Sequence, residues 1–219
     1  MRNYQIHLIR HGRTQGNAQG RFIGATDLPL SDGGRRELLV LTEEYCYPPA
    51  ELVYAAAHTR ARQTAEILYP DRELVAVPEL CEMSFGLFEG KSPQELNQNE
   101  AFLRWAEGGM ISAPPGGEDG KQFAARVAAG FTAVAEDLFR RHAFSCAVVC
   151  SGSALLSILM QFTRGHGDDM FRWMVDSGRG YTLLLNPQLW MNDRVLETAE
   201  SIPYRLSDEV DFKQIYFGE

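Results

Sequence analysis

The short stretch Leu8-Ile9-Arg10-His11-Gly12 places a guanidinium group and an imidazole side by side at the point where an apolar run ends. Arginine offers a planar fork of donors that matches phosphate oxygens. An imidazole that is neutral at working pH can attack phosphorus as a nucleophile. Taken alone, this stretch is also compatible with a strand-end histidine capped by a carbonyl group. Further motifs are therefore needed to support phosphate chemistry.

Four further motifs occur along the chain, and two of them are joined to a predicted helix. One opens the helix after the second strand, and another precedes the longest helical pattern. The motifs are Gly20-Arg21-Phe22-Ile23-Gly24 followed by Asp27-Leu28-Pro29-Leu30-Ser31, Arg60-Ala61-Arg62-Gln63-Thr64-Ala65, Glu79-Leu80-Cys81-Glu82 before Phe85-Gly86 and Glu89-Gly90, and Pro114-Pro115-Gly116-Gly117-Glu118 before the helical pattern that carries Arg126.

With these five motifs in this order, the sequence resembles the histidine phosphatase superfamily, the phosphoglycerate-mutase-like proteins. The resemblance runs from about residue 4 to about residue 185, most of the chain. It implies a three-layer α/β/α sandwich with a largely parallel central sheet. It also implies phosphoryl transfer through a phosphohistidine, which relies on Arg and His and needs neither a metal nor another cofactor.

The resemblance implies a role for individual side chains of this chain. The nucleophile would be His11, and the general acid that then becomes the base would be Glu82. Phosphoryl oxygens would be bound by Arg10 and Arg60, with a further donor from Asn17. These roles agree with elementary chemistry, because phosphoryl transfer depends mostly on positioning and charge neutralisation.

The roles assigned to Arg60 and Glu82 each have a competing explanation. A cation in the first turn of a helix, such as Arg60, opposes the helix dipole, so a bound anion accounts for it better than a solvated position. Glu79 is a second carboxylate close to Glu82, but the spacing to Phe85-Gly86 favours Glu82. The alternative for Glu82 itself is an ordinary surface carboxylate.

Ser151 marks the main departure from the family pattern. It follows the apolar run 147–150, where the family has a second histidine that donates to the phosphoryl group. A hydroxyl is shorter and neutral, and loss of one such donor typically costs about 10²–10³ in rate. The sequence therefore leaves two interpretations open. One is a slow phosphomonoesterase acting on a small phosphorylated metabolite, and the other is a catalytically inactive protein that binds a phosphate ligand.

The segment 83–117 and the residue before Arg60 bear on the substrate. The segment lacks the long insertion of the glycolytic mutases, which favours a broad phosphomonoesterase over a mutase-type phosphotransferase. Its aromatic side chains predict local core packing, with an apolar substrate wall as the alternative. His58 occupies a place where the family often has Ser-Pro-Leu; we expect it on the surface, although it could supply a polar contact. The aromatic residues are Phe85, Phe88, Phe102 and Trp105.

Apolar runs that alternate with helical patterns predict the α/β elements that must position these residues. We expect one domain over residues 1–219, with 83–117 as an insertion over the active-site end. Ligands in such sheets bind at the carboxyl ends of the strands. The predicted strands are 5–9, 51–57, 74–77, 147–150 and 181–185, and the predicted helices are 33–46 after Ser31, 59–69, 119–142 and 153–163.

Composition limits the partners. The chain has 219 residues, 45% of them hydrophobic, and a net charge of −8. This balance disfavours nucleic acid, yet a local arginine cluster can still bind a small phosphorylated metabolite or inorganic phosphate. No apolar run approaches about 18 residues, so no membrane is expected. Four cysteines without a C-x-x-C pair, and no leader-like start, predict a reducing cytoplasmic compartment.

Overall fold

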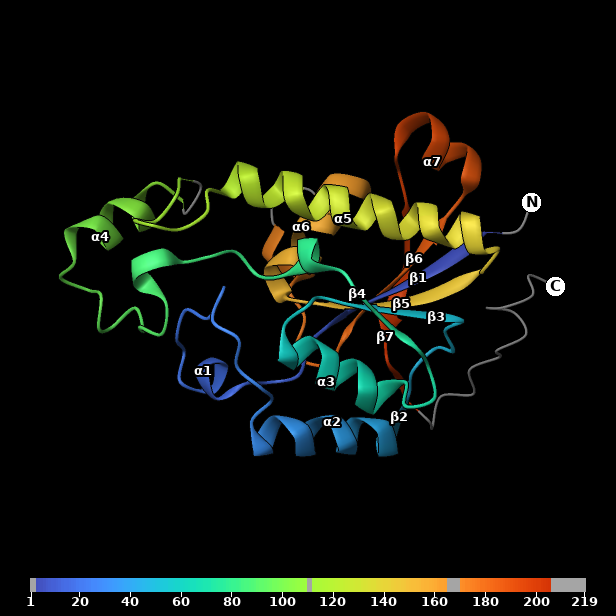
Figure 1. The fold of residues 1–219 in the computed structure, drawn as a ribbon, viewed down its shortest axis with the longest axis horizontal. Helices are drawn as coiled ribbons and strands as arrows, with labels where there is room; N and C mark the ends of the chain where they lie inside the picture. Colours follow the sequence, from blue (N-terminus) through green and yellow to red (C-terminus); the bar gives the residue numbers. More distant parts are fainter. Residues whose placement is uncertain (1–2, 110–111, 165–169, 206–219) are drawn as a thin grey trace.

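A six-stranded sheet forms the centre of the computed structural model, which describes residues 3–109, 112–164 and 170–205 (Figure 1). The strand order is β4-β3-β5-β1-β6-β7. Neighbours from β4 to β1 pair in parallel, and β6 pairs antiparallel with both β1 and β7. The largely parallel sheet is thus confirmed. The strands are β1 (Tyr4–Arg10), β3 (Leu52–Ala55), β4 (Leu74–Ala76), β5 (Ser145–Cys150), β6 (Gly180–Leu185) and β7 (Glu197–Ile202).

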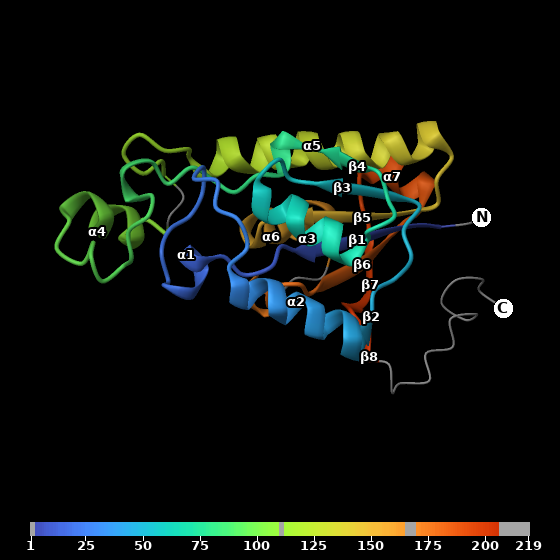
Figure 2. The same cartoon turned by 60° about the horizontal axis from the view of Figure 1, so that its bottom comes forward.

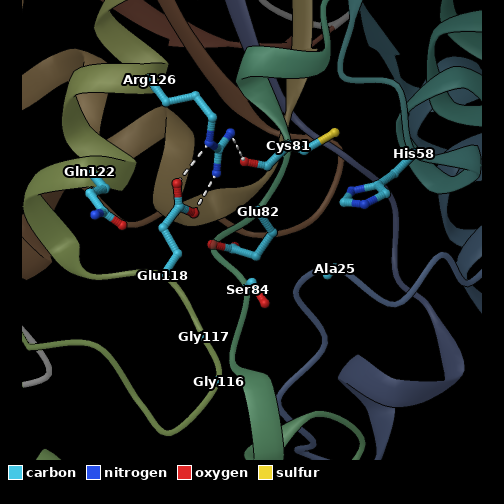
Figure 3. Close-up of a pocket in the computed structure, with 10 residues that line it drawn as sticks. All are labelled: Ala25, His58, Cys81, Glu82, Ser84, Gly116, Gly117, Glu118, Gln122 and Arg126. Carbon is cyan, nitrogen blue, oxygen red and sulfur yellow. Dashed lines mark hydrogen bonds and ion pairs between the residues drawn. The ribbon is translucent and has the colours of Figure 1, made fainter.

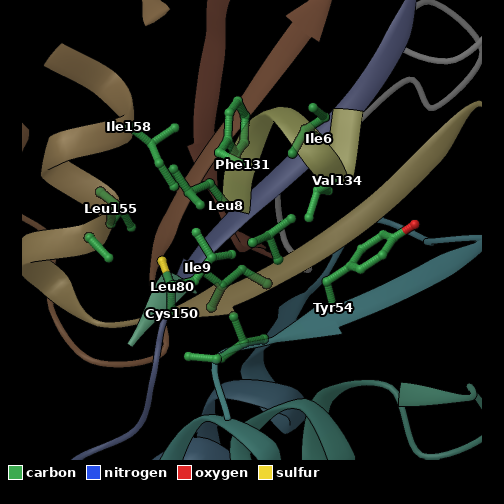
Figure 4. Packing of buried hydrophobic residues seen from close by; sticks show 14 of the residues in the cluster. Ile6, Leu8, Ile9, Tyr54, Leu80, Phe131, Val134, Cys150, Leu155 and Ile158 are labelled. Carbon is green, nitrogen blue, oxygen red and sulfur yellow. The ribbon is translucent and has the colours of Figure 1, made fainter. Parts of the chain in front are cut away.

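The two central strands, β1 and β5, are apolar because both of their faces are covered. Ile6 and Leu8 of β1 and Val148 and Val149 of β5 have no exposed surface (Figure 4). Parallel strands buried on both sides give such continuous apolar runs. These runs were therefore visible in the sequence, whereas the edge strand β7, with its exposed polar positions, was not predicted.

Helices cover both faces of the sheet and complete three layers (Figure 2). The helices α2 (Asp32–Glu44) and α3 (Thr59–Leu68) pack together on one face. On the other face lie α5 (Gly120–Arg141) and α6 (Gly152–Phe162), which contact each other. The short helix α7 (Pro187–Asp193) joins this second layer through Trp190, whose ring lies against Phe131 and Phe162. The α/β/α architecture predicted from the sequence is confirmed.

Polar side chains fix where the main helices begin. Ser31 caps α2, as predicted, by accepting a hydrogen bond from the Gly34 N–H. Asp119 caps α5 through two backbone N–H groups. The prediction of one helix over 33–46 is wrong at its end, because α2 stops at Glu44. The next two residues form β2 (Tyr45–Cys46), which pairs with β8 (Tyr204–Arg205).

Segment 83–117 extends from the end of the molecule where β1 terminates and α1 (Gln15–Ala18) begins (Figures 1 and 2). It contains η2 (Gly86–Phe88) and α4 (Glu100–Glu107), and η1 (Pro78–Leu80) leads into it. Its aromatic rings contact one another and Phe22, with Phe88 and Trp105 at most 3% exposed. Core packing of these rings is therefore confirmed. Among the residues described, no helix has the length and apolar character needed to cross a membrane.

Candidate active site

Arg10 is the last residue of β1, and the loop that follows, beginning at His11, is tied to two neighbouring elements. The His11 N–H donates to the Cys150 carbonyl at the end of β5, at 2.9 Å. The next N–H, that of Gly12, donates to the Thr64 hydroxyl of α3, also at 2.9 Å. Thr64 is fully buried and His11 is only 6% exposed. The loop therefore has a fixed place at the carboxyl ends of the parallel strands.

The His11 imidazole is oriented as a nucleophile would be. Its Nδ1 lies 2.7 Å from the Gly12 carbonyl oxygen, so the neutral ring donates from Nδ1 and keeps the lone pair on Nε2. Burial, together with the positive charges of Arg60 and Arg10, lowers the pKa of His11 from 6.5 to about 3. The ring is therefore neutral across the working pH range and able to attack an electrophile.

Arg60 lies at the start of α3 and is 1% exposed. Its Nη1 donates to the Thr26 carbonyl and its Nη2 to the Gly24 carbonyl, both at 2.9 Å. The same Nη2 lies 2.9 Å from Nδ1 of His58. Burial and the charge of Arg60 lower the pKa of His58, so this neutral ring accepts the hydrogen bond. The expected surface placement of His58 is therefore wrong: it is partly buried and holds the arginine.

Arg10 closes the other side of the site. Its Nη1 donates to the Val175 carbonyl at 2.7 Å. Its Nε is buried and has no hydrogen-bond partner within the described parts of the chain. A Cβ built on Gly152, the first residue of α6, would lie 3.2 Å from this Nε, so the helix backbone passes close by. A buried donor without a partner is costly, and a bound anion would satisfy it.

Glu82 follows η1 and is partly buried near the two serines that begin α6. Its Oε1 accepts from the Met83 N–H at 2.8 Å. Burial raises the pKa of the Glu82 carboxyl above its usual value, although the Met83 N–H, Ser153, Arg60 and Ser151 oppose the shift. A carboxyl group that keeps its proton can act as a general acid. Glu79, by contrast, packs its Cβ against Gly130 of α5.

Ser151 lies at the end of β5, is 2% exposed, and caps α6. Its Oγ accepts from the Ala154 N–H at 3.2 Å, and the side chain lies near enough to the Glu82 carboxyl group to oppose the rise in its pKa. Asn17 contributes to the cap of α1. Its Oδ1 accepts from the N–H and hydroxyl of Thr14, the N-cap of α1. Among the described residues it makes no hydrogen bond to the other candidate side chains, so only five of the six are joined by contacts or charge.

Glu89 organises the loop that receives Arg60. Its carboxylate accepts from the N–H groups of Gly24 at 3.1 Å, Ala25 at 2.9 Å and Phe85 at 3.0 Å, and from the Thr26 hydroxyl at 2.7 Å. Burial acts to raise the pKa of Glu89, but these donors outweigh it and lower the pKa. The sequence marked Glu89 as part of a motif without revealing this role.

A pocket of about 510 Å³ lies beside Glu82, between the 81–84 segment and the start of α5 (Figure 3). Its lining includes His58, Ser84, Gln122 and the ion pair of Glu118 with Arg126. The sequence alone indicates no role for this pair, although Glu118 and Arg126 both belong to the last of the five motifs. His166, one of the five histidines of the chain, lies outside the described residues. Within those residues no group of three or more His, Cys, Asp or Glu could hold a metal ion.

Comparisons with known proteins identify the family of this chain. The sequence profile of the histidine phosphatase superfamily (branch 1) matches residues 6–209. The chain is 30% identical over 179 residues to the adenosylcobalamin/alpha-ribazole phosphatase of Escherichia coli, covering 80% of this chain and 86% of that one. It is 32% identical over 127 residues to 2,3-bisphosphoglycerate-dependent phosphoglycerate mutase 2 of Gloeobacter violaceus, covering 54% and 58%.

A solved structure shares the fold. The alpha-ribazole phosphatase of Shigella flexneri superposes with a TM-score of 0.75 at 24% identity, over 89% of this chain and 94% of that one. The profile match spans most of the chain and includes every residue of the site described above. The chain therefore belongs to the histidine phosphatase superfamily, branch 1.

Proposed function

We propose that this protein hydrolyses small phosphomonoesters through a phosphohistidine on His11. The observation that carries the proposal is the buried, neutral His11, whose Nδ1 is tied to the Gly12 carbonyl and whose surroundings include two guanidinium groups. An anion between Arg10 and Arg60 would present its phosphorus to the free Nε2. Membership of a superfamily that contains phosphatases and mutases supports phosphoryl transfer at this site.

The proposed reaction has two steps. Nε2 of His11 attacks phosphorus, the bond from phosphorus to the ester oxygen breaks, and Glu82 gives its proton to the leaving alcohol. In the second step the Glu82 carboxylate takes a proton from water as the water oxygen attacks phosphorus. The phosphorus–nitrogen bond then breaks, which restores neutral His11 and releases inorganic phosphate. Arg10 and Arg60 neutralise the charge on the non-bridging oxygens in both steps.

We propose that Ser151 makes this turnover slow. Its hydroxyl stands at the position where the family pattern has a histidine, and its oxygen accepts from the Ala154 N–H. A hydroxyl is also shorter than an imidazole and carries no charge, so it is a weaker donor to a phosphoryl oxygen. A catalytically inactive phosphate-binding protein is the alternative that this same observation favours. A mutase-type phosphotransferase is a second alternative, supported by the similarity to the Gloeobacter violaceus mutase.

Hydrolysis of p-nitrophenyl phosphate, combined with trapping of the phosphoenzyme, tests the proposal. Label from a ³²P-phosphoester should remain on the protein after an alkaline quench, which preserves phosphohistidine. His11→Ala should lose both label and turnover. His142→Asn is the matched control, since His142 is an exposed residue in the left-handed conformation at the end of α5. Phosphate binding without label would favour the inactive protein, and transfer to an added alcohol or phosphoester in place of water would favour the phosphotransferase.

A further inference from the structure

The guanidinium of Arg126 is held by four hydrogen bonds at the wall of the pocket beside Glu82 (Figure 3). Nε and Nη2 donate to the two carboxylate oxygens of Glu118, at 2.9 and 2.7 Å. Nη1 donates to the carbonyls of Glu79 at 2.6 Å and Cys81 at 3.1 Å. Because arginine has five N–H donors, this residue has little left for a ligand.

Glu118 is fixed in place by backbone contacts between its loop and the segment after Glu82. The Glu118 N–H donates to the Ser84 carbonyl at 3.0 Å, and the Leu87 N–H donates to the Pro115 carbonyl at 2.9 Å. Gly86 has a φ of +53°, and a Cβ on it would lie 2.2 Å from the Pro115 oxygen. Such a close approach requires glycine. Glu118, whose carboxylate neutralises Arg126, is thus held in the pocket wall by backbone contacts, and its side chain is 17% exposed.

The lining of this pocket offers no unpaired cation to a ligand. Among its described lining residues, Arg126 is the one guanidinium or ammonium group, and it faces the carboxyl groups of Glu118 and Glu82. Burial lowers the pKa of His58, so this ring adds no charge near neutral pH. Ser84 and Gln122 contribute neutral donors and acceptors. The lining can therefore hydrogen-bond to a polar group but cannot neutralise an anion.

We infer that the Glu118–Arg126 pair determines specificity, restricting the site to phosphomonoesters whose alcohol carries no second anionic group. The inference rests on the proposed function, because it assigns this pocket to the leaving alcohol. An anionic alcohol would meet a saturated guanidinium, the protonated carboxyl group of Glu82 and no free cation, so it would lose its hydration without gaining a charged partner. A neutral alcohol with hydroxyl or amide groups finds partners on the lining. Specificity of this kind depends on what the site disfavours as well as on what it binds.

Glu118→Gln tests the inference, because it keeps the shape of the side chain but removes the charge that neutralises Arg126. Glycerol 3-phosphate and 3-phosphoglycerate are the substrates, since they share a carbon chain and differ in a hydroxymethyl group against a carboxylate. We expect the wild type to favour glycerol 3-phosphate in kcat/KM by about tenfold or more. Glu118→Gln should move this ratio towards 3-phosphoglycerate by about tenfold, or about 1.4 kcal/mol.

Two further variants complete the experiment. Glu136→Gln is the matched control, because Glu136 lies on α5, the helix that carries Arg126, and pairs at 3.6 Å with Arg194 in solvent. It should leave the ratio unchanged. The double variant Glu118→Gln with Arg126→Gln removes the released cation and should return the ratio towards that of the wild type. A role confined to stability would lower turnover of both esters equally, so an unchanged ratio in Glu118→Gln overturns the inference.

Binding of the same two esters to proteins carrying His11→Ala, measured by calorimetry, separates this inference from the proposed function. If the wild type hydrolyses neither ester but the binding preference still follows residue 118, the proposed function fails and the specificity role holds. If the protein hydrolyses the esters but its preference between them does not depend on residue 118, the specificity role fails while the proposed function stands. A wild type that prefers 3-phosphoglycerate in both assays also overturns the inference.

Discussion

Glu82 combines two properties that conflict in most proteins. Its carboxyl group is partly removed from water beside Ser151 and Ser153, yet the proposed reaction requires it to ionise in each cycle. Burial raises its pKa and so favours the protonated form. The same burial makes the ionised form costly for the folded protein. Activity and stability at this residue should therefore change in opposite directions.

Glu82→Gln should lower kcat by about 10²–10⁴, the usual contribution of a general acid. It should also remove the alkaline decline in kcat that follows deprotonation of Glu82. Because the pKa is raised in the folded state, the group stabilises the fold at low pH and loses this effect as pH rises through its folded pKa. Glu82→Gln should therefore become progressively more stable than the wild type as pH increases, as measured by urea unfolding at several pH values. A stability difference independent of pH would contradict this assignment.

Ser151→His should raise kcat by about tenfold or more, because it supplies the donor to the phosphoryl group that the hydroxyl does not. The effect should appear in kcat more than in KM, as expected for an interaction that strengthens in the transition state. The substitution also removes the N-cap of α6, at a cost of about 1 kcal/mol in unfolding free energy. Ser151→Ala separates the two effects, since it removes the cap without adding an imidazole. No gain in kcat from the histidine would favour the inactive phosphate-binding protein.

At the scale of elements, the start of α5 contributes both to the stability of the fold and to the wall of the pocket. The helix begins with Asp119, whose Oδ1 accepts from the N–H groups of Lys121 and Gln122, both at 2.8 Å. The residue before this cap is Glu118, and about two turns further along the helix Arg126 contacts the backbone that leads to Glu82. The start of α5 therefore sets both the position of the helix and the wall of the pocket.

Asp119→Ala should lower the free energy of unfolding by about 1 kcal/mol, the usual effect of losing a helix cap. For a chain of this size, the loss corresponds to a Tm about 2–4 °C lower. It should also reduce kcat/KM, because frayed residues at the start of α5 no longer hold Glu118. Asn186→Ala is the control: Asn186 caps α7 through Gln188 and Leu189, away from the pocket. Equal losses of activity in both variants would contradict a link between α5 and the pocket.

The elements that sequence reasoning predicted are those whose pattern is local. The apolar runs of β1 and β5 and the periodic apolar positions of α5 carry their own signal, and Ser31 marks a helix start. β6 was recognised as a strand, but its antiparallel direction follows from pairing with β1 across about 175 residues, as for His7 with Thr182. β2, β7 and β8 were missed because each is short or polar and is stabilised mainly by its partner strand.

The candidate site residues also divide into those that a local sequence pattern reveals and those that it does not. Arg10, His11, Arg60 and Glu82 lie in local motifs, so the sequence could name them. The roles of Glu118 and Arg126 depend on a loop that folds back onto the 84–87 backbone, which no local pattern reveals. The partner of His58 is likewise visible only once the Arg60 side chain turns towards it.

At the scale of the whole molecule, the sheet contains an imidazole that resists protonation. His7 lies in the centre of β1, 1% exposed, with Nδ1 at 3.1 Å from the Thr182 hydroxyl of β6. Burial lowers its pKa from 6.5 to about 4. Between these values the unfolded chain binds a proton that the folded chain does not, so stability falls as pH decreases through this window.

His7→Gln should reduce the acid sensitivity of the fold. Protonation of His7 accounts for a loss of roughly 3 kcal/mol in unfolding free energy between about pH 6.5 and pH 4. The substitution also changes packing at neutral pH, so the slope of unfolding free energy against pH is the quantity to compare. His142→Gln, on the surface at the end of α5, should keep the wild-type slope. An equal slope in all three proteins would exclude His7 as a source of acid sensitivity.

The loop at residues 24–26 connects two ions at the edge of the proposed phosphate site. One peptide unit, the carbonyl of Gly24 with the N–H of Ala25, lies between two ions: its oxygen accepts from Arg60 and its N–H donates to Glu89. Each ion polarises this peptide in the same direction, so the two hydrogen bonds strengthen each other. The peptide thus acts as a relay between a carboxylate and a guanidinium that do not touch. Through it, Glu89 makes the Gly24 carbonyl a stronger acceptor for Arg60, the residue that we propose binds a phosphoryl oxygen, without any side chain having to move.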